Sequence, residues 1–293
     1  MSAFIKLTQN NNDLAFLLES VEGGENLARF SLIGSRPFKT LKTGPEEKLK
    51  GDPLIHLENE MKNYDCIEFP NLKLPPFIGG AVGYVGYDCV RYFEPSTERF
   101  VSAQKAKMKI PESVFMLCDT IVVFDHVRHS LKIVSHVRLD TDDLSSAYES
   151  ATKRLDFVIS RLSSPILSYG TSSSSSSRKR KSQEEKKNLD IESMSNVGQS
   201  GYESFVKSLK TNITNGDIIQ AVPSQRIAIP MRNPNDENEA FNLYRRLRMI
   251  NPSPYMFFLR LGNGTYVAGA SPEMLCKFER ETRVVTTHPI AGT

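Results

Sequence analysis

Residues 255–268 read YMFFLRLGNGTYVA, in which two apolar, strand-favouring runs flank Asn263-Gly264. An Asn-Gly pair in this position predicts a β-hairpin, because both residues tolerate the positive φ that a tight turn needs. We therefore expect 255–261 and 265–268 to pair as antiparallel strands. The preceding segment, Asn251-Pro252-Ser253-Pro254, makes the entry to the hairpin rigid. The aromatic wall that follows is either ordinary core or the face of a site for a planar ligand.

Upstream of the hairpin, the apolar periodicity predicts two helices. The second starts near Asn235 and ends before Asn251, with Ala240, Leu243, Tyr244 and Leu247 on one face. The first begins at a capping box, Ser200 to Glu203, and stops at Asn215-Gly216. Between them, Ile218 to Ile229 has the pattern of a strand interrupted by Pro223.

The first part of the chain mixes both kinds of element. We expect a short helix from Asp13 to Glu22, a strand over 30–34 and a hairpin of 121–124 with 131–134. A long amphipathic helix follows over 144–162, and Pro165 ends it. Helices and hairpins are grouped and do not alternate as β-α-β units, so the pattern favours an α+β fold.

A segment over 164–197 separates the two parts of the chain. It contains six consecutive serines, Ser172 to Ser177, and then the basic run 178–181. Such a composition cannot bury apolar surface, so we expect a disordered linker or insertion. The basic run also fits a nuclear-targeting or anion-binding patch, but a solvated loop is the favoured interpretation. The expected organisation is thus 1–163, the linker 164–197, and 198–293.

The composition indicates a water-soluble globular protein. Hydrophobic residues make up 39% of the 293 residues and the net charge is +3, which argues against a nucleic-acid-binding protein. No apolar run is long enough to cross a bilayer, and no apolar leader follows Met1, so we expect no membrane association and a cytoplasmic location. The four cysteines are far apart in sequence, which favours reduced intracellular thiols over zinc or redox motifs.

The glycine-rich run Gly79 to Asp88 reads GGAVGYVGYD. Its spacing differs from the G-x-G-x-x-G of dinucleotide-binding proteins, and no suitably placed acid follows. We favour a strand in which glycines let a neighbouring backbone approach closely. Further on, Ser271-Pro272 resembles a helix start, with Ser271 as cap and the following Glu273 as an alternative site carboxylate.

The last residues, 283–287, have a strand pattern that we expect to be buried. They lead into Gly292-Thr293, a pair suited to offering a backbone amide and a hydroxyl to an anion. Because a buried strand that heads into such a turn is an unusual terminus, we expect a fragment truncated at its C-terminus. Residues 17–20, Leu-Leu-Glu-Ser, place a carboxylate beside a hydroxyl. The pair fits either a solvated end of an element or a site for an ammonium group.

Taken together, these motifs resemble those of the chorismate-utilising enzymes. The segments that carry the resemblance are Gly216 to Arg226, Asn251 to Phe258, Gly269 to Glu273, and Pro289 to Thr293. Residues 17–20, 33–38 and 79–88 resemble the amino-terminal region of the anthranilate synthase component I family. The similarity covers nearly the whole chain in order, apart from the linker, which resembles insertions in fungal members. The fold that it implies is a sandwich of antiparallel sheets with helices outside.

The resemblance implies a lyase reaction for tryptophan biosynthesis. Chorismate loses its ring hydroxyl as ammonia attacks, and pyruvate is then eliminated to leave anthranilate. Mg²⁺ organises the substrate, with ligands expected beyond residue 293 and none in this chain. Ammonia comes from glutamine through a glutamine amidotransferase partner, component II, and tryptophan inhibits. This fragment alone is expected to be inactive. The alternatives are an aminodeoxychorismate synthase component I and a non-catalytic tryptophan-binding regulatory fragment.

Site residues follow from the same resemblance. Gly292 and Thr293 match the turn that contacts chorismate. Gln220 and Ala291 replace lysines of related enzymes that use water or an enzyme amine as nucleophile, so ammonia is the implied nucleophile. His288 is expected to be structural. The residues that match an inhibitor pocket for tryptophan are Leu18, Glu19, Ser20, Pro254, Tyr255 and Met256.

Overall fold

The chain folds into two compact units. A computed structural model groups Met1–Tyr169 with Ala240–Thr293 in the first unit, and Gly170–Glu239 form the second. Each unit is described by itself. The structure describes residues 1–9, 13–21, 29–67, 74–98, 110–140, 143–165, 190–231, 237–279 and 281–289.

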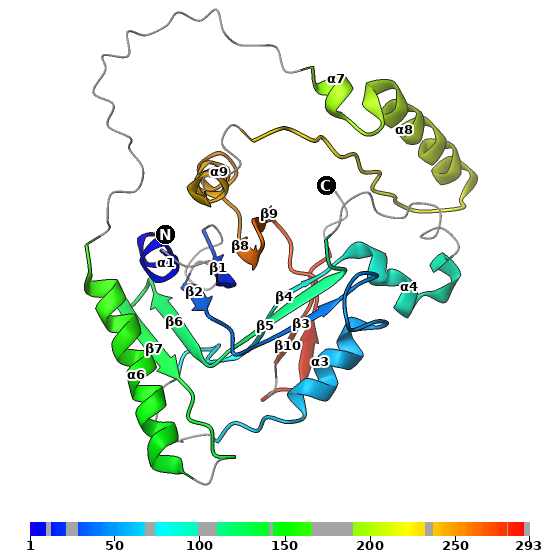
Figure 1. Cartoon of the computed structure of the whole chain (residues 1–293). Helices are drawn as coiled ribbons and strands as arrows, with labels where there is room; N and C mark the ends of the chain where they lie inside the picture. The colour runs from blue at the N-terminus through cyan, green and yellow to red at the C-terminus, as the bar shows by residue number, and fades with distance from the viewer. Residues whose placement is uncertain are drawn as a thin grey trace, which may run out of the picture. The chain divides into compact units, whose positions relative to one another are not determined.

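The first unit is built on a six-stranded antiparallel sheet (Figure 1). Its strand order, β7-β6-β2-β1-β8-β9, places strands from the two ends of the chain side by side at its centre. The sheet therefore joins both of the ranges that the sequence predicts as separate domains, whose boundaries stay a prediction. The strands are β1 (Ala15–Glu19), β2 (Phe30–Ser35), β6 (Thr120–Asp125), β7 (Ser130–Ser135), β8 (Tyr255–Gly262) and β9 (Thr265–Ser271).

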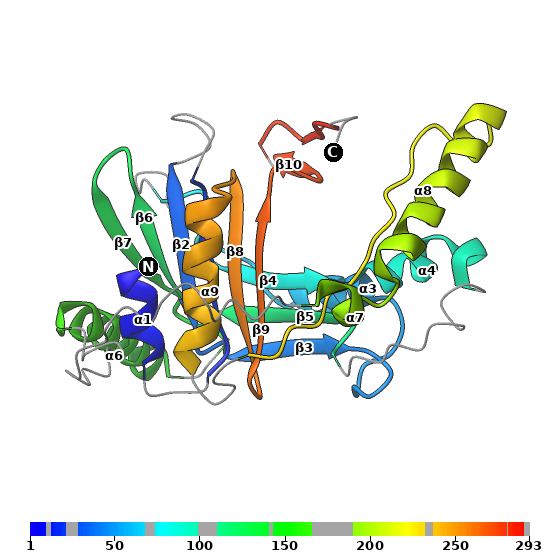
Figure 2. The ribbon, with the colours of Figure 1, turned by 90° about the horizontal axis from the view of Figure 1, so that it is seen from above.

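A second, three-stranded antiparallel sheet packs on one face of the first. It consists of β3 (Lys39–Thr43), β5 (Ser113–Cys118) and β4 (Gly80–Val85), in the order β3-β5-β4. Its strands cross those of the larger sheet (Figure 2). The apolar core between the sheets includes Phe16 and Leu259 from one sheet and Met116 from the other. Its exclusion of water is a main source of the stability of this unit.

Helices cover the outer faces of this sandwich. On the six-stranded sheet lie α1 (Ser2–Thr8), α6 (Leu144–Ser163) and α9 (Glu237–Ile250), whose apolar side chains form a second core with Leu17 and Phe258. On the other side, α3 (Pro53–Met61) packs Leu57 against the three-stranded sheet. The α+β sandwich with helices outside is confirmed. Three short helical segments follow β4: η1 (Tyr87–Cys89), α4 (Val90–Phe93) and η2 (Pro95–Thr97).

The hairpins and the long helix are where the sequence predicts them. β8 and β9 pair around Asn263-Gly264, whose φ angles are 51° and 69°. β6 pairs with β7, and α6 ends at Ser163, before Pro165. The two hairpins could be predicted from local turn residues, because the strands of each hairpin follow one another directly in sequence.

The prediction of a helix from Asp13 to Glu22 is wrong, because residues 15–19 of this segment form the strand β1. Ala15, Phe16 and Leu17 are at most 1% exposed, since β1 lies between β2 and β8 with a core on each face. A strand that is buried on both faces shows no alternation, so its pattern resembles that of a short buried helix. The helices α1 and α3 were not predicted from the sequence.

The glycine-rich run forms β4, as the close-packing interpretation predicts. A Cβ atom at Gly83 would lie 1.7 Å from the carbonyl oxygen of Val114 on β5, so a side chain has no room there. Gly34 on β2 is similar, because the ring of Phe16 occupies the space of the missing side chain. These glycines serve sheet packing.

In the second unit, α7 (Ile191–Met194) and α8 (Gly198–Asn215) follow the expected linker, whose last residues are therefore helical. α8 ends at Gly216 as predicted, with φ 82°. The prediction that this helix begins at a capping box at Ser200 is wrong, because α8 already begins at Gly198. The strand over 218–229 is also wrong: its described residues form one isolated bridge, between Ile227 and Ser195. Pro223 lacks an N–H group, and none of the strands in the part of the chain that the structure describes pairs with the segment.

The end of the chain differs from expectation in two ways. β10 (Lys277–Glu279) and β11 (Val284–Thr286) form a small separate sheet, and Val285 is 67% exposed, so the expected burial is wrong. Ser271-Pro272 starts no helix; the Ser271 hydroxyl accepts a hydrogen bond from the Glu273 amide within a turn. Gly292 and Thr293 lie outside the described residues.

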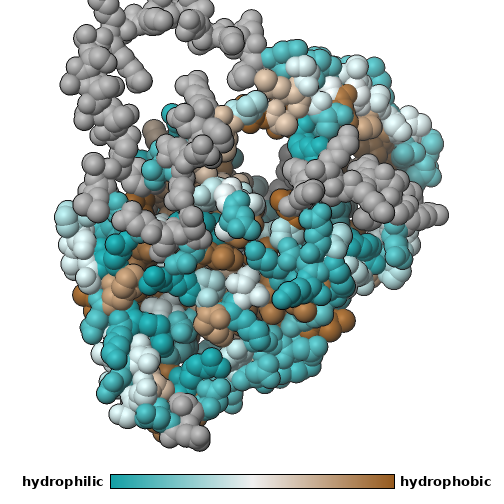
Figure 3. Space-filling model, viewed as in Figure 1, coloured by the Kyte–Doolittle hydropathy of each residue, from teal (hydrophilic) through white to brown (hydrophobic). Residues whose placement is uncertain are grey.

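The described surface is largely polar (Figure 3), and the cysteines are not paired with one another. Hydrophilic residues cover most of the face seen in Figure 3, with apolar residues scattered among them. None of the helices within the described ranges combines the length and the apolar character needed to cross a membrane. All four cysteines are free thiols, and burial raises the pKa of Cys118 to about 12.

Candidate functional site

The segments that carry the expected inhibitor residues are neighbours in the sheet. β1 pairs with β8 in an antiparallel register that places Leu18 opposite Phe257 and Glu19 opposite Met256. Just beyond the paired residues, the Val21 amide donates a 3.2 Å hydrogen bond to the carbonyl of Ser253. Ser20 therefore lies next to Tyr255, although more than 200 residues separate them in sequence. The structure brings 18–20 and 254–256 together.

Their side chains divide between the two faces of the sheet. Leu18 belongs with the core between the sheets, whereas Met256 belongs with the core under the helices. Because side chains alternate along a strand, Ser20 and Tyr255 continue on the side of Leu18, and Glu19 is on the side of Met256. The Ser20 and Tyr255 side chains therefore share one face of the sheet, and those of Glu19 and Met256 share the other.

Two buried polar atoms near these segments have no hydrogen-bond partner among the described residues: Oγ of Ser20 and Nε of Arg248, of which the second lies 3.6 Å from the Glu19 carboxylate. A buried hydroxyl without a partner costs free energy, about 1 to 3 kcal/mol, unless another molecule supplies the hydrogen bond. The Ser20 hydroxyl is therefore a group to which a bound molecule could supply the missing hydrogen bond.

Glu19 is not solvated, which corrects the simple structural interpretation of residues 17–20. Its side chain is 7% exposed and its Oε2 accepts a 2.7 Å hydrogen bond from the Tyr244 hydroxyl. The Arg248 guanidinium lies 3.6 Å from the same oxygen. Burial, together with the neighbouring Glu19 carboxylate, raises the pKa of Tyr244, so the tyrosine remains a neutral donor. The Glu19 carboxylate is thereby directed toward α9.

Sequence reasoning missed Tyr244 and Arg248 as partners of this site. It assigned Tyr244 to the apolar face of a helix, where Tyr244 indeed lies, fully buried beside Phe258. The signal that was available is the hydroxyl itself, because a buried tyrosine needs a hydrogen-bond partner. The prediction that Leu243 shares the buried face of this helix is wrong, because the Leu243 side chain is 61% exposed.

The roles of the expected catalytic residues stay predictions. Gln220 belongs to the second unit, where it is exposed in a segment without regular structure. Gly292 and Thr293 are outside the described residues, so their contact with a substrate stays a prediction. His288 is exposed near the end of the described chain. Within the described ranges, no three His, Cys, Asp or Glu side chains cluster in a way that could hold a metal ion.

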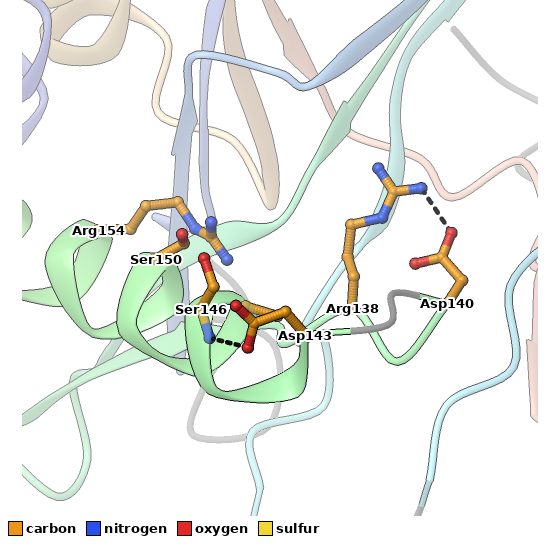
Figure 4. Close-up of a pocket in the computed structure, with 7 residues that line it drawn as sticks. Arg138, Asp140, Asp143, Ser146, Ser150 and Arg154 are labelled. Atoms are coloured by element: carbon orange, nitrogen blue, oxygen red, sulfur yellow. Dashed lines mark hydrogen bonds and ion pairs between the residues drawn. The ribbon is translucent and has the colours of Figure 1, made fainter.

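An open groove of about 410 Å³ lies at the start of α6 (Figure 4). Its charged groups are already paired: Arg138 with Asp140 at 3.2 Å, and Arg154 with the carbonyl of His136 at 2.6 Å. The Asp143 carboxylate caps the helix by accepting from the Ser146 amide. The groove is thus a surface feature of mixed charge. Its lining consists of Arg138, Asp140, Asp143, Ser146, Ala147, Ser150 and Arg154.

Comparison with known proteins identifies the family. The family model described as chorismate binding enzyme matches residues 13–293. The chain is 43% identical to anthranilate synthase component 1 of Saccharomyces cerevisiae and 41% identical to a probable anthranilate synthase component 1 of Schizosaccharomyces pombe. Each comparison covers 99% of this chain, but 54% and 53% of the relative. The chain thus spans about half the length of these curated relatives.

A solved structure supports the fold. Anthranilate synthase component I from Streptococcus pneumoniae superimposes with a TM-score of 0.59 at 23% identity. The match covers 86% of this chain and 52% of that chain. At this level of identity the likeness concerns the fold, whereas the sequence match over 13–293 concerns ancestry. The chain belongs to the chorismate-binding enzyme family.

Proposed function

We propose that this chain is part of an anthranilate synthase component I, which converts chorismate and ammonia to anthranilate, pyruvate and water in a lyase reaction. The observation that carries the proposal is the 43% identity to the Saccharomyces cerevisiae relative, which runs through 99% of this chain. The relative is named anthranilate synthase component 1. A component 1 implies a second component, and we propose a glutamine amidotransferase that delivers ammonia.

Gln220 supports ammonia as the nucleophile. A side-chain amide cannot act as a general base, in contrast to an amine whose pKa is lowered. Gln220 is therefore suited to orient a reactant and unsuited to activate water. The backbone amide and hydroxyl of Gly292 and Thr293 are proposed to bind the chorismate carboxylate.

Mg²⁺ is proposed to neutralise and orient the substrate carboxylate in the whole protein. The described residues do not fit the ion, since they contain no suitable cluster of three ligands. The position of its ligands stays an expectation from the family resemblance, and we assign no step to the ion.

Tryptophan is the proposed inhibitor, bound where the end of β1 meets the segment before β8. Three observations support this site: the adjacency of the two segments, the unpartnered Ser20 hydroxyl and the aromatic face of Tyr255. An indole packs well on an aromatic ring, and the α-ammonium and carboxylate groups of an amino acid can satisfy a hydroxyl.

The product of a fusion protein tests the proposal. This chain replaces the matching part of the Saccharomyces cerevisiae relative, and the fusion receives chorismate, an ammonium salt and Mg²⁺. We expect fluorescent anthranilate and pyruvate in equal amounts. Formation of aminodeoxychorismate without pyruvate would contradict the proposal and favour an aminodeoxychorismate synthase component I.

A tryptophan-binding regulatory fragment is the second candidate, and the observation that favours it is the unpartnered Ser20 hydroxyl where 18–20 meet 254–256. Measurements on the 293-residue chain alone distinguish the regulatory fragment from the anthranilate synthase component. If it binds tryptophan while both it and a correctly folded fusion form no anthranilate, the regulatory function is supported.

A further inference from the structure

Glu19 is a buried carboxylate with two partners on one helix. Its Oε2 accepts from the Tyr244 hydroxyl at 2.7 Å and lies 3.6 Å from Nε of Arg248. A charge with 7% of its side chain exposed is tolerated only when it is paired and hydrogen-bonded. These contacts link the last residue of β1 to α9.

The helix holds both partners in fixed positions. Tyr244 and Arg248 are one turn apart on α9, so they point to the same side. The Tyr244 ring is fully buried, with its centroid 5.8 Å from that of Phe241 and 5.5 Å from that of Phe258. Because these rings hold the Tyr244 ring in place, its hydroxyl group points toward the Glu19 carboxylate.

The same helix leads directly into the opposite wall of the proposed inhibitor site. α9 ends at Ile250, and the segment 251–254 then enters β8. In that segment, the Ser253 carbonyl accepts from the Val21 amide at 3.2 Å. Both sequence neighbours of Ser20 are thus hydrogen-bonded to the continuous stretch 244–253: Glu19 to Tyr244, and Val21 to Ser253.

We propose that Tyr244, assisted by Arg248, is a positioning residue for tryptophan binding. This inference rests on the inhibitor site proposed above. Tyr244 acts through Glu19 and does not touch the ligand. By fixing the end of β1 relative to the segment before β8, it keeps Ser20 and Tyr255 in the arrangement that the ligand requires. Such pre-organisation increases affinity, because the ordering cost is met before the ligand arrives.

The first test is Tyr244→Phe, which keeps the packed ring and removes the hydroxyl. Calorimetry with tryptophan on the complete 293-residue chain is expected to show about tenfold weaker binding, as for the loss of one charge-assisted hydrogen bond. The matched control is Tyr266→Phe, because the Tyr266 ring stacks on the same Phe258 at 5.8 Å. Equal losses in the two variants would overturn the proposal, since they would reflect general loosening of the core.

A double-variant cycle tests the route through Glu19. If Tyr244 acts only through that carboxylate, the combination of Tyr244→Phe with Glu19→Gln binds tryptophan no more weakly than Glu19→Gln alone. Fully additive losses would overturn the route.

A ligand-free measurement keeps this inference separate from the proposed function. In Tyr244→Phe, the Val21 amide is expected to exchange its hydrogen faster in NMR, whereas in Tyr266→Phe its rate stays that of the unaltered chain. An unchanged Val21 rate would overturn the positioning role even if tryptophan binds. If the unaltered chain binds no tryptophan, the inhibitor site fails, and the proposed role in binding fails with it.

Discussion

At Gly34, the six-stranded sheet requires the absence of a side chain. A Cβ atom there would lie 2.3 Å from Cε1 of Phe16, which faces it across β1 and β2 and is fully buried. Because Phe16 has no free space to move into, we expect Gly34→Ala to destabilise the fold by about 1 to 3 kcal/mol, as overpacked cores do. Urea denaturation measures the change.

Ala268→Val is the control for added bulk, since Ala268 is exposed on β9. It is expected to leave the free energy of unfolding nearly unchanged. If Gly34→Ala were as stable as this control, Phe16 would not be confined as described.

Gln220 offers a chemical prediction at the residue scale. In the fusion protein, Gln220→Lys introduces an amine that can become a general base once its pKa is lowered. We expect part of the chorismate to react with water in place of ammonia, so that an isochorismate-type product accompanies anthranilate. Chromatography of the products measures the ratio. Anthranilate as the sole product would remove the proposed role of this position.

Asp125 at the end of β6 gives a pH dependence to the sheet. The Arg29 side chain donates to its carboxylate at 2.8 and 3.1 Å, and this lowers the pKa of Asp125 from 3.8 to about 2. A carboxylate with a lowered folded-state pKa contributes stability above its unfolded pKa, and this contribution is lost as the pH falls toward the folded value.

We therefore expect unfolding by urea to become easier between about pH 4 and pH 2, with part of the slope due to Asp125. Asp125→Asn removes that part, so its stability should vary less over this interval. Asp140→Asn is a suitable control, because Asp140 and its partner Arg138 are both more than half exposed. Identical acid limbs for Asp125→Asn and the unaltered chain would contradict the account.

The elements differ in how well their sequences predict them. The 255–268 hairpin carries its own turn, and α6 carries its own periodicity, so local reasoning finds both. β1 is different, because its partners β2 and β8 determine its conformation, and β8 is distant in sequence. In isolation, Ala15 to Glu19 has no alternation that would distinguish a strand from a helix.

At the scale of the whole molecule, the candidate site depends on contacts that no local rule provides. The meeting of 18–20 with 254–256 was expected from family resemblance, and in the structure these residues lie where the end of β1 meets the start of β8. The division of their side chains between two faces follows only once the strand character of β1 is known. Tyr244 could be related to Glu19 only in three dimensions, since α9 reaches the site through tertiary packing.

The central claim is that the end of β1 and the start of β8 form one tryptophan site. Titration calorimetry of the chain with tryptophan, compared with Ser20→Arg, tests it most directly, because the substitution replaces the buried Ser20 hydroxyl with a large cation. A thermal melt shows whether both chains are folded, and the corresponding fusion is expected to retain anthranilate formation. We expect one bound tryptophan per unaltered chain and none for the folded Ser20→Arg variant. Equal tryptophan binding by the two chains, or none by either, would contradict the account.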